Sequence, residues 1–198
     1  MAIKSLIDWI KRKINMNMPE DIKVATREVI VPFTSTSVDD LVGSIVTFFN
    51  VDPKRNGDNW ITDIVNTATG EKSPTPPLYF YFEPIPPESK APKDLELYQK
   101  LVLIIDLQQS KNELWQFYGD GIVFIDQPLA SQLNVQTEIK NQGKRLVLTI
   151  DKVAEGLDNI DLKMRYVASR INLTKGAGKL KVYYSQDPSI SVGRRKED

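Results

Sequence analysis

Apolar and polar residues alternate through the second half of the chain, which is the pattern of a β-strand with one buried and one exposed face. The alternation runs over residues 133–140, 146–150, 160–166 and 180–184. Turn-forming residues separate these runs, as expected for strands that are joined by short loops. We therefore predict a series of β-strands, and we expect residues 161–192 to contain two long strands joined by a loop.

Longer apolar runs predict further strands. Residues 21–33 and 59–66 are rich in β-branched side chains, and residues 95–107 hold a continuous apolar run that is typical of a buried strand. Residues 78–82, with the sequence LYFYF, carry apolar side chains on both faces. Because aromatic side chains are usually placed in protein interiors, a buried strand is favoured here over an exposed aromatic patch.

A hairpin is predicted between residues 114 and 125. Two apolar runs, LWQFY and IVFI, flank Gly119-Asp120-Gly121. Glycine readily adopts the left-handed backbone conformations that tight turns require. We therefore interpret these three residues as a loop that reverses the chain.

Residues 37–50 fit both a short helix and a strand. Ser37 and Asp40 stand at the spacing of a helical capping box. The apolar residues with helical spacing are Val38, Leu41, Val42, Ile45 and Phe49. The competing interpretation is a strand over residues 44–50, because SIVTFFN consists mainly of strong strand formers. We favour a short helix over residues 38–49.

The N-terminal residues 2–16 predict an amphipathic helix. Its apolar stripe consists of Ile3, Leu6, Ile7, Ile10 and Ile14, and Trp9 lies on the flank of this stripe. The other face carries Lys4, Lys11, Arg12 and Lys13 against the single Asp8. A basic amphipathic helix suits an anionic membrane surface, but most such helices bury the apolar stripe against protein. Docking on the β core or on a neighbouring subunit is therefore favoured.

A proline-rich segment surrounds the LYFYF run. Residues 73–93 contain seven of the twelve prolines of the chain. Proline disfavours helix at the preceding residue and cannot donate a ladder hydrogen bond. We predict an extended surface loop over residues 84–92, and we expect Pro84, Pro86 and Pro87 to face a partner.

Together these elements predict a mainly β protein, namely an antiparallel β-sandwich of Ig-like or jelly-roll outline with an N-terminal amphipathic helix. Residues 1–18 form the helix and a hinge, residues 19–192 form a single sandwich domain, and residues 193–198 form a charged flexible tail. No segment has the charge pattern of a secretion signal, and no apolar run is long enough to span a membrane. The chain is expected in the cytoplasm or assembled in a particle.

The composition limits the partners and the catalytic or metal sites that the chain can have. The chain has 26 basic and 26 acidic residues, which removes the electrostatic argument for a nucleic-acid partner. It contains neither histidine nor cysteine. Serine–histidine–aspartate triads, thiol nucleophiles and metal sites built on His or Cys are therefore excluded. We expect no cofactor.

A catalytic or metal site in this chain would therefore have to use carboxylates or a metal ion with oxygen ligands. Residues 52–58 form a turn with possible oxygen ligands, but Lys54 stands where a calcium loop needs an oxygen ligand. A glycan-directed enzyme would use carboxylates and aromatic platforms. The candidates for such a site are Asp106, Glu113, Asp120 and Asp126, with Trp60 and Trp115 as platforms.

The closing segment, residues 183–192, reads YYSQDPSISV, with an aromatic pair, Asp187-Pro188 and a β-branched run. It resembles the terminal strand of small bacterial β-sandwich proteins of the DP-EP type and of the AidA/PixA inclusion-body family. Glu83-Pro84 also fits a DP-EP interpretation. The resemblance implies an Ig-like sandwich with a non-enzymatic role, and it transfers no catalytic residues.

The function favoured by the sequence is a structural or protein-interaction module. It would self-assemble or dock on a larger complex through the N-terminal helix and the proline-rich loop. The alternatives are a carboxylate-dependent enzyme on a glycan-like substrate and a peripheral membrane protein that is attached through residues 2–16.

Overall fold

The structure is a computed structural model that describes residues 27–32, 43–53, 59–84, 99–111, 113–128, 130–172, 180–186 and 188–194. Within these residues the chain forms strands and no helix. The strands are β1 (Arg27–Val31), β2 (Gly43–Asp52), β3 (Ile61–Val65), β4 (Lys72–Pro74), β5 (Leu78–Phe82), β6 (Gln99–Leu107), β7 (Glu113–Phe124), β8 (Asn134–Lys140), β9 (Arg145–Asp151), β10 (Ile160–Asn172), β11 (Lys181–Tyr184) and β12 (Ser189–Arg194).

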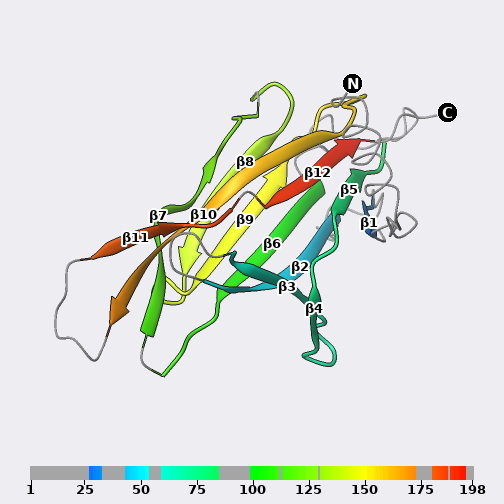
Figure 1. Ribbon diagram of the computed structural model, residues 1–198. Helices are drawn as coiled ribbons and strands as arrows, with labels where there is room; N and C mark the ends of the chain where they lie inside the picture. The colour runs from blue at the N-terminus through cyan, green and yellow to red at the C-terminus, as the bar shows by residue number, and fades with distance from the viewer. Residues whose placement is uncertain are drawn as a thin grey trace, which may run out of the picture.

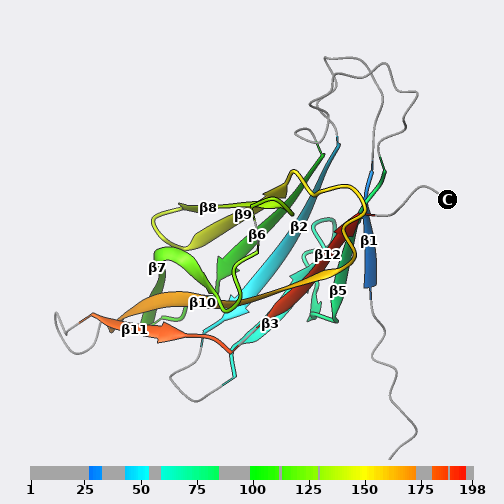
Figure 2. The same cartoon turned by 90° about the horizontal axis from the view of Figure 1, so that it is seen from above.

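The strands form two six-stranded sheets that lie in two layers (Figures 1 and 2). The first sheet has the order β1-β5-β12-β10-β11, and β7 pairs with β10 on the edge opposite β11. The second sheet has the order β4-β3-β2-β6-β9-β8. In Figure 1, β10 and β12 cross in front of β9 and β6.

Both sheets contribute to one hydrophobic core. Phe80, Phe82 and Leu162 of the first sheet and Leu148 and Ile150 of the second sheet are all at most 1% exposed. Alternation explains which residues reach this core, because successive side chains of a strand point to opposite faces. The protein is thus mainly β, as the sequence predicted.

The prediction of purely antiparallel sheets was wrong, because both sheets are mixed. β5 pairs in parallel with both β1 and β12, and β2 pairs in parallel with β6. Parallel neighbours need a long connection, so they are distant in sequence and leave no turn signal between them. The chain between β2 and β6 includes β3, β4 and β5, which provide such a connection.

The helix that was favoured over residues 38–49 is also wrong where the structure describes this segment. β2 runs from Gly43 to Asp52, which confirms the competing strand interpretation. Ile45 and Phe49 are strand formers, and pairing with β6 over nine residues outweighs their helical spacing. Residues 33–42 lie outside the described residues.

The predicted hairpin at Gly119-Asp120-Gly121 is wrong as well, because β7 continues through it from Glu113 to Phe124. Gly119 and Gly121 have positive φ values, 61° and 79°. These values accommodate a bulge rather than a reversal, since β10 pairs with β7 on both sides of a register shift. Glycines with positive φ occur both in tight turns and in bulges, so the sequence alone did not exclude a hairpin.

The closing strands match the prediction only in part, because two long strands were expected over residues 161–192 and the structure has three strands, of which β10 alone is long. β10 pairs antiparallel with β11 and β12, which lie one after the other along the same edge. β12 extends to Arg194, two residues into the segment expected to be a flexible tail. The predicted N-terminal helix, residues 2–16, lies outside the described residues.

Candidate functional site

A row of apolar side chains crosses the outer face of the second sheet. Val65 of β3 is in register with Phe48 of β2, Phe48 with Ile104 of β6, and Ile104 with Val147 of β9. Residues in register on neighbouring strands share one face of a sheet. Val46 and Val102 form a second, shorter row beside the first. We call these residues the outer apolar face: Val46, Phe48, Val65, Val102, Ile104 and Val147.

None of these six residues belongs to the hydrophobic core or packs against it. Val46 is 47% exposed, and the other five are partly exposed. The neighbouring residues of β2 and β6, such as Phe49, Leu103 and Ile105, point inward and are buried. The sheet therefore has an apolar inner face and, across four strands, an apolar outer face.

Polar residues bound the outer apolar face. Lys72 of β4 is in register with Val65 at one end of the row, and Glu138 of β8 is in register with Val147 at the other end. The adjacent row consists of Asp63, Asn50, Asp106, Arg145 and Lys140. An apolar patch with a polar rim is typical of a surface that contacts protein.

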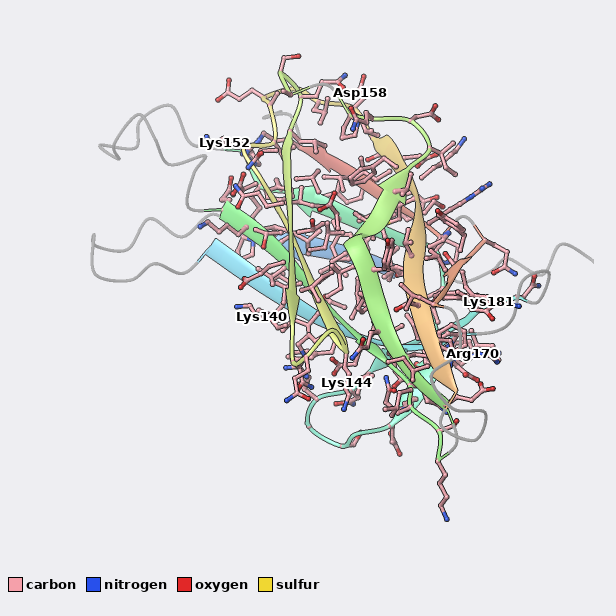
Figure 3. The ribbon with its side chains drawn as sticks, turned by 90° about the vertical axis from the view of Figure 1, so that its left-hand side faces the viewer. Lys140, Lys144, Lys152, Asp158, Arg170 and Lys181 are labelled. Atoms are coloured by element: carbon pink, nitrogen blue, oxygen red, sulfur yellow. The ribbon has the colours of Figure 1, made fainter. Side chains whose placement is uncertain are left out.

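Two hydrogen bonds hold the centre of that polar row. Arg145 donates from Nε to Asp106 Oδ1 at 2.7 Å and from Nη2 to Asp106 Oδ2 at 2.8 Å. This bidentate contact with Asp106 raises the pKa of Arg145 above its usual value, while partial burial opposes the rise. Figure 3 shows Lys140, the last residue of this row, near Lys144 at one end of the sheets, and Lys152 and Asp158 at the other end.

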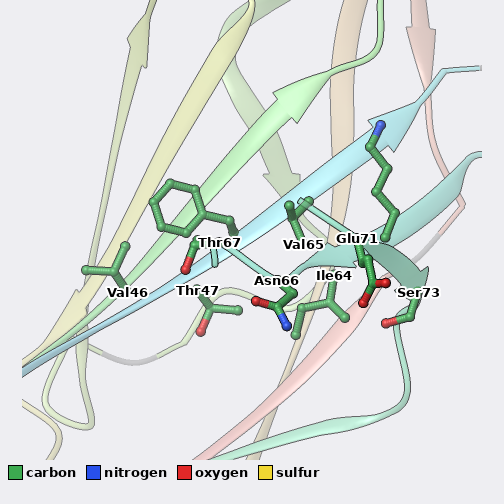
Figure 4. A pocket seen from close by; sticks show the side chains of 10 residues that line it. Val46, Thr47, Ile64, Val65, Asn66, Thr67, Glu71 and Ser73 are labelled. Atoms are coloured by element: carbon green, nitrogen blue, oxygen red, sulfur yellow. The ribbon is translucent and has the colours of Figure 1, made fainter. Parts of the chain in front are cut away.

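A groove opens where β3 leaves β2. β3 pairs with β2 only from Phe48 to Asp52, whereas β6 pairs with β2 from Gly43 onward. The resulting cavity has a volume of about 670 Å³. Its lining residues are Val46, Thr47, Phe48, Ile64, Val65, Asn66, Thr67, Glu71, Lys72 and Ser73. Figure 4 shows Val46 and Thr47 on one side of it and Glu71 and Ser73 on the other.

The turn between β3 and β4 fixes the far wall of this groove. The Asn66 side chain accepts a hydrogen bond from the Ala68 amide at 3.0 Å, and the Asn66 amide donates to the Glu71 carbonyl at 2.9 Å. Gly70 supplies the positive φ that closes the turn. Because Val46, Phe48 and Val65 line the groove, it is continuous with the outer apolar face.

The candidate acids do not gather into one site. Asp106 binds Arg145, and Glu113 accepts a hydrogen bond from Arg170 at 2.7 Å. Asp120 and Asp126 are exposed in the bulge and the loop that follow. Among the residues that the structure describes, no three His, Cys, Asp or Glu residues lie together where they could hold a metal ion. Residues 54–58, in the turn considered as a calcium loop, lie outside the described residues.

Trp60 and Trp115 are not the exposed platforms that a glycan site requires. They are 7% and 3% exposed and contact each other edge to face, with ring centroids 6.0 Å apart. Tyr183 packs on Trp115 at 5.1 Å, and the Arg170 guanidinium lies over both of these rings. This prediction was therefore wrong, because the aromatic cluster closes one end of the core.

The predicted interaction residues lie mainly outside the described part of the chain. Ile3, Leu6, Ile7, Trp9, Ile10, Ile14, Pro86 and Pro87 belong to this group. Pro84 is described, and it is partly exposed just after β5. In the LYFYF run, Leu78, Phe80 and Phe82 are buried, which confirms the core interpretation, while Tyr79 and Tyr81 lie partly exposed on the outer face.

Arg194 is a buried residue whose importance the sequence did not reveal. It is 4% exposed, and its guanidinium lies 5.8 Å from the Phe82 ring centroid. It donates hydrogen bonds to the carbonyls of Val153 and Glu83 and to the Gln99 side chain, each at 2.8 Å. It thus joins the ends of β5 and β12 to the start of β6 and to the loop after β9.

The two dipeptides that carried the resemblance stand at opposite ends of adjacent strands. Glu83-Pro84 follows β5, and Pro188 precedes β12, while β5 and β12 run parallel. The Glu83 carbonyl accepts hydrogen bonds from Gln99 and Arg194, and the Pro188 carbonyl accepts one from the Met164 amide. Their placement indicates two separate structural contacts rather than one shared site.

Comparison with protein families matches residues 32–194 to the DP-EP family. A comparison with curated proteins found no match. The match covers the region that carries both dipeptides, and the resemblance to the AidA/PixA family stays a prediction. Across the described residues, the structure contains no helix long and apolar enough to cross a membrane.

Proposed function

The chain belongs to the DP-EP family, and we propose that it is a non-enzymatic structural module that assembles into a larger complex. Attachment takes place through the N-terminal amphipathic segment, residues 2–16, and the proline-rich loop, residues 84–92. The platform is a β-sandwich related to the Ig-like type that the family resemblance implied, with parallel strand pairs added to it.

The observation that carries this proposal is the outer apolar face. Single exposed apolar residues are normal on protein surfaces, but here four partly exposed apolar residues lie in register across four strands. Water contact with such a row is unfavourable by about 25 cal/mol for each Å² of apolar area. A protein partner that covers the row recovers this free energy.

The ion pairs of the candidate acids and the burial of the candidate aromatic residues also support a non-enzymatic role. Asp106 and Glu113 are bound to arginines, and Trp60 and Trp115 are buried. A general acid needs a carboxyl group that can reach a substrate proton, and a sugar platform needs an exposed ring face. These residues instead stabilise strand ends and one end of the core.

The proposal is tested by the mass in solution, measured by light scattering, of the full chain and of a chain that lacks residues 1–18. We expect the full chain to have the mass of an assembly and the shortened chain to have the mass of one molecule. β1 begins at Arg27, so the deletion leaves both sheets intact. Monomers of both chains at every concentration would contradict the proposal.

A further inference from the structure

We propose that the outer apolar face is the docking surface for residues 2–16, the amphipathic segment of this same chain. This inference rests on the proposed function, because it names the surface that the attachment segment binds. The contact would place the stripe Ile3, Leu6, Ile7, Ile10 and Ile14 on the row Val65, Phe48, Ile104 and Val147.

The two apolar surfaces match in length. Ile3 and Ile14 are eleven positions apart, which spans about 16 Å in a helix that rises about 1.5 Å per residue. The row from Val65 to Val147 crosses four neighbouring strands. At about 4.8 Å between strands, it spans about 14 Å. A helix that lies across the strands therefore covers the whole row.

The area of the face favours a helix over a second sheet. The two rows cover four strands in one direction, about 19 Å, and about 7 Å in the other, which gives roughly 130 Å² at most. A stable interface buries about 800 Å² on each partner. Two such faces packed together would leave most of that area polar, whereas one helix of about 10 Å diameter fits the patch.

The chain also has the reach that this contact needs. Ten residues, 17–26, separate the segment from β1. Fully extended, they span about 33 Å. The layer outside the second sheet lies about 20 Å from the first sheet, because packed layers are about 10 Å apart. The segment can therefore reach its own outer apolar face or that of an adjacent copy.

The groove beside the face provides room for a large side chain. Its volume is about 670 Å³, and Val46, Phe48 and Val65 make it continuous with the row. Trp9 flanks the apolar stripe of the segment. An indole needs an apolar wall with a polar atom nearby for its N–H, and Thr47 and Ser73 carry hydroxyl oxygens among the residues that line the groove.

Cysteine cross-linking tests the docking directly, because the chain contains no natural cysteine. The test protein is the full chain with Ile10→Cys and Val102→Cys, treated with a short bifunctional maleimide. The matched control carries Ile10→Cys and Val123→Cys, since Val123 is 50% exposed on the first sheet. We expect a yield about tenfold higher for the test pair, because docking raises the effective concentration of the two thiols.

The outcomes separate this inference from the proposed function. Cross-links between differently labelled chains, one with Ile10→Cys and the other with Val102→Cys, would support both. Cross-links that form only within single molecules would support the docking surface and contradict assembly. Equal yields for the test and control pairs would overturn the inference. If the mass in solution still fell on removal of residues 1–18, the proposed function would stand even though the docking inference had failed.

A variant of the outer apolar face tests whether the cross-link depends on docking. Ile104→Glu places a charge in the centre of the row, at a partly exposed position outside the core. We expect it to lower the yield of the Ile10→Cys and Val102→Cys pair to that of the control pair, with an unchanged thermal unfolding midpoint. An unchanged yield would overturn the inference.

Discussion

Replacement of Arg194 by methionine should destabilise the fold strongly although the residue lies in the last described strand. The side chain of Arg194 is 4% exposed and makes three hydrogen bonds of 2.8 Å to Val153, Glu83 and Gln99. Methionine retains most of the apolar stem but cannot donate. The variant would therefore leave three acceptors without this donor, at the end of β5, at the start of β6 and in the loop after β9.

The expected loss follows from these contacts. A hydrogen bond to a charged group contributes about 1.5–3 kcal/mol. The cost of removing a guanidinium from water offsets part of the sum, so the net loss is smaller than three such bonds. We expect the free energy of unfolding to fall by about 3 kcal/mol, which is a large part of the roughly 5–15 kcal/mol of a typical domain.

Urea unfolding followed by tryptophan fluorescence measures this loss, because Trp60 and Trp115 are buried and report on the core. The matched control is Arg145→Met. Arg145 also makes two charged hydrogen bonds, but its side chain is 37% exposed, so we expect a loss of at most about 1 kcal/mol. Equal losses for the two variants, or a loss below about 0.5 kcal/mol for Arg194→Met, would refute the reasoning.

Two further predictions concern the bulge and the core. Gly121→Ala should destabilise the protein by about 1–3 kcal/mol, because its Cβ would lie 2.8 Å from Leu146 Cδ1, whereas Gly119→Ala meets no atom within 4 Å. Thermal unfolding compares the two, and equal effects would rule out the Leu146 contact as the cause. Burial raises the pKa of Tyr166, so the folded protein retains a proton that the unfolded chain loses above about pH 10. Stability should therefore fall as pH rises from there, by at most about 1.4 kcal/mol per pH unit. Tyr166→Phe should remove this part of the fall in urea titrations at pH 8 and pH 11, and Tyr184→Phe, at a position 53% exposed, should not; the same slope in both variants would contradict the assignment.

The sequence predicted the strands that have one buried face. Alternation over residues 133–140 and 146–150 corresponds to β8 and β9, and the closing strands β10 and β11 lie where the pattern placed them. β8 and the first half of β10 each expose a polar face, so the period of two is visible in the residues themselves. β9 and β11 do not, because Val147 of β9 lies on the outer apolar face, and at β11 Leu180 and Tyr184 are exposed whereas Tyr183 is buried.

Strand pairing and the bulge could not be predicted in this way. Parallel neighbours such as β2 and β6 are joined by no short turn, so nothing local in the sequence indicates that they pair. Gly119 and Gly121 favour positive φ, but the residues alone do not decide between a hairpin and a bulge. Long-range pairing with β10 decides this case.

The outer apolar face did leave a signal in the sequence. Residues 45–49 and 101–105 are almost continuously apolar, IVTFF and LVLII, and such runs are typical of strands covered on both faces. In the described part of the chain, one face of these strands contacts the core and the other stays partly exposed. In the first run, the helical spacing of Ile45 and Phe49 favoured a helix over a strand.

We propose that the chain assembles through its N-terminal segment. The most direct measurement is sedimentation velocity of the full chain over a range of concentrations, compared with the same chain carrying Ile7→Asp and Ile10→Asp. These substitutions keep the length of the chain and both sheets, but they place charge in the apolar stripe. The account predicts an assembly for the unmodified chain and a monomer for the variant. The same mass for both chains would contradict it.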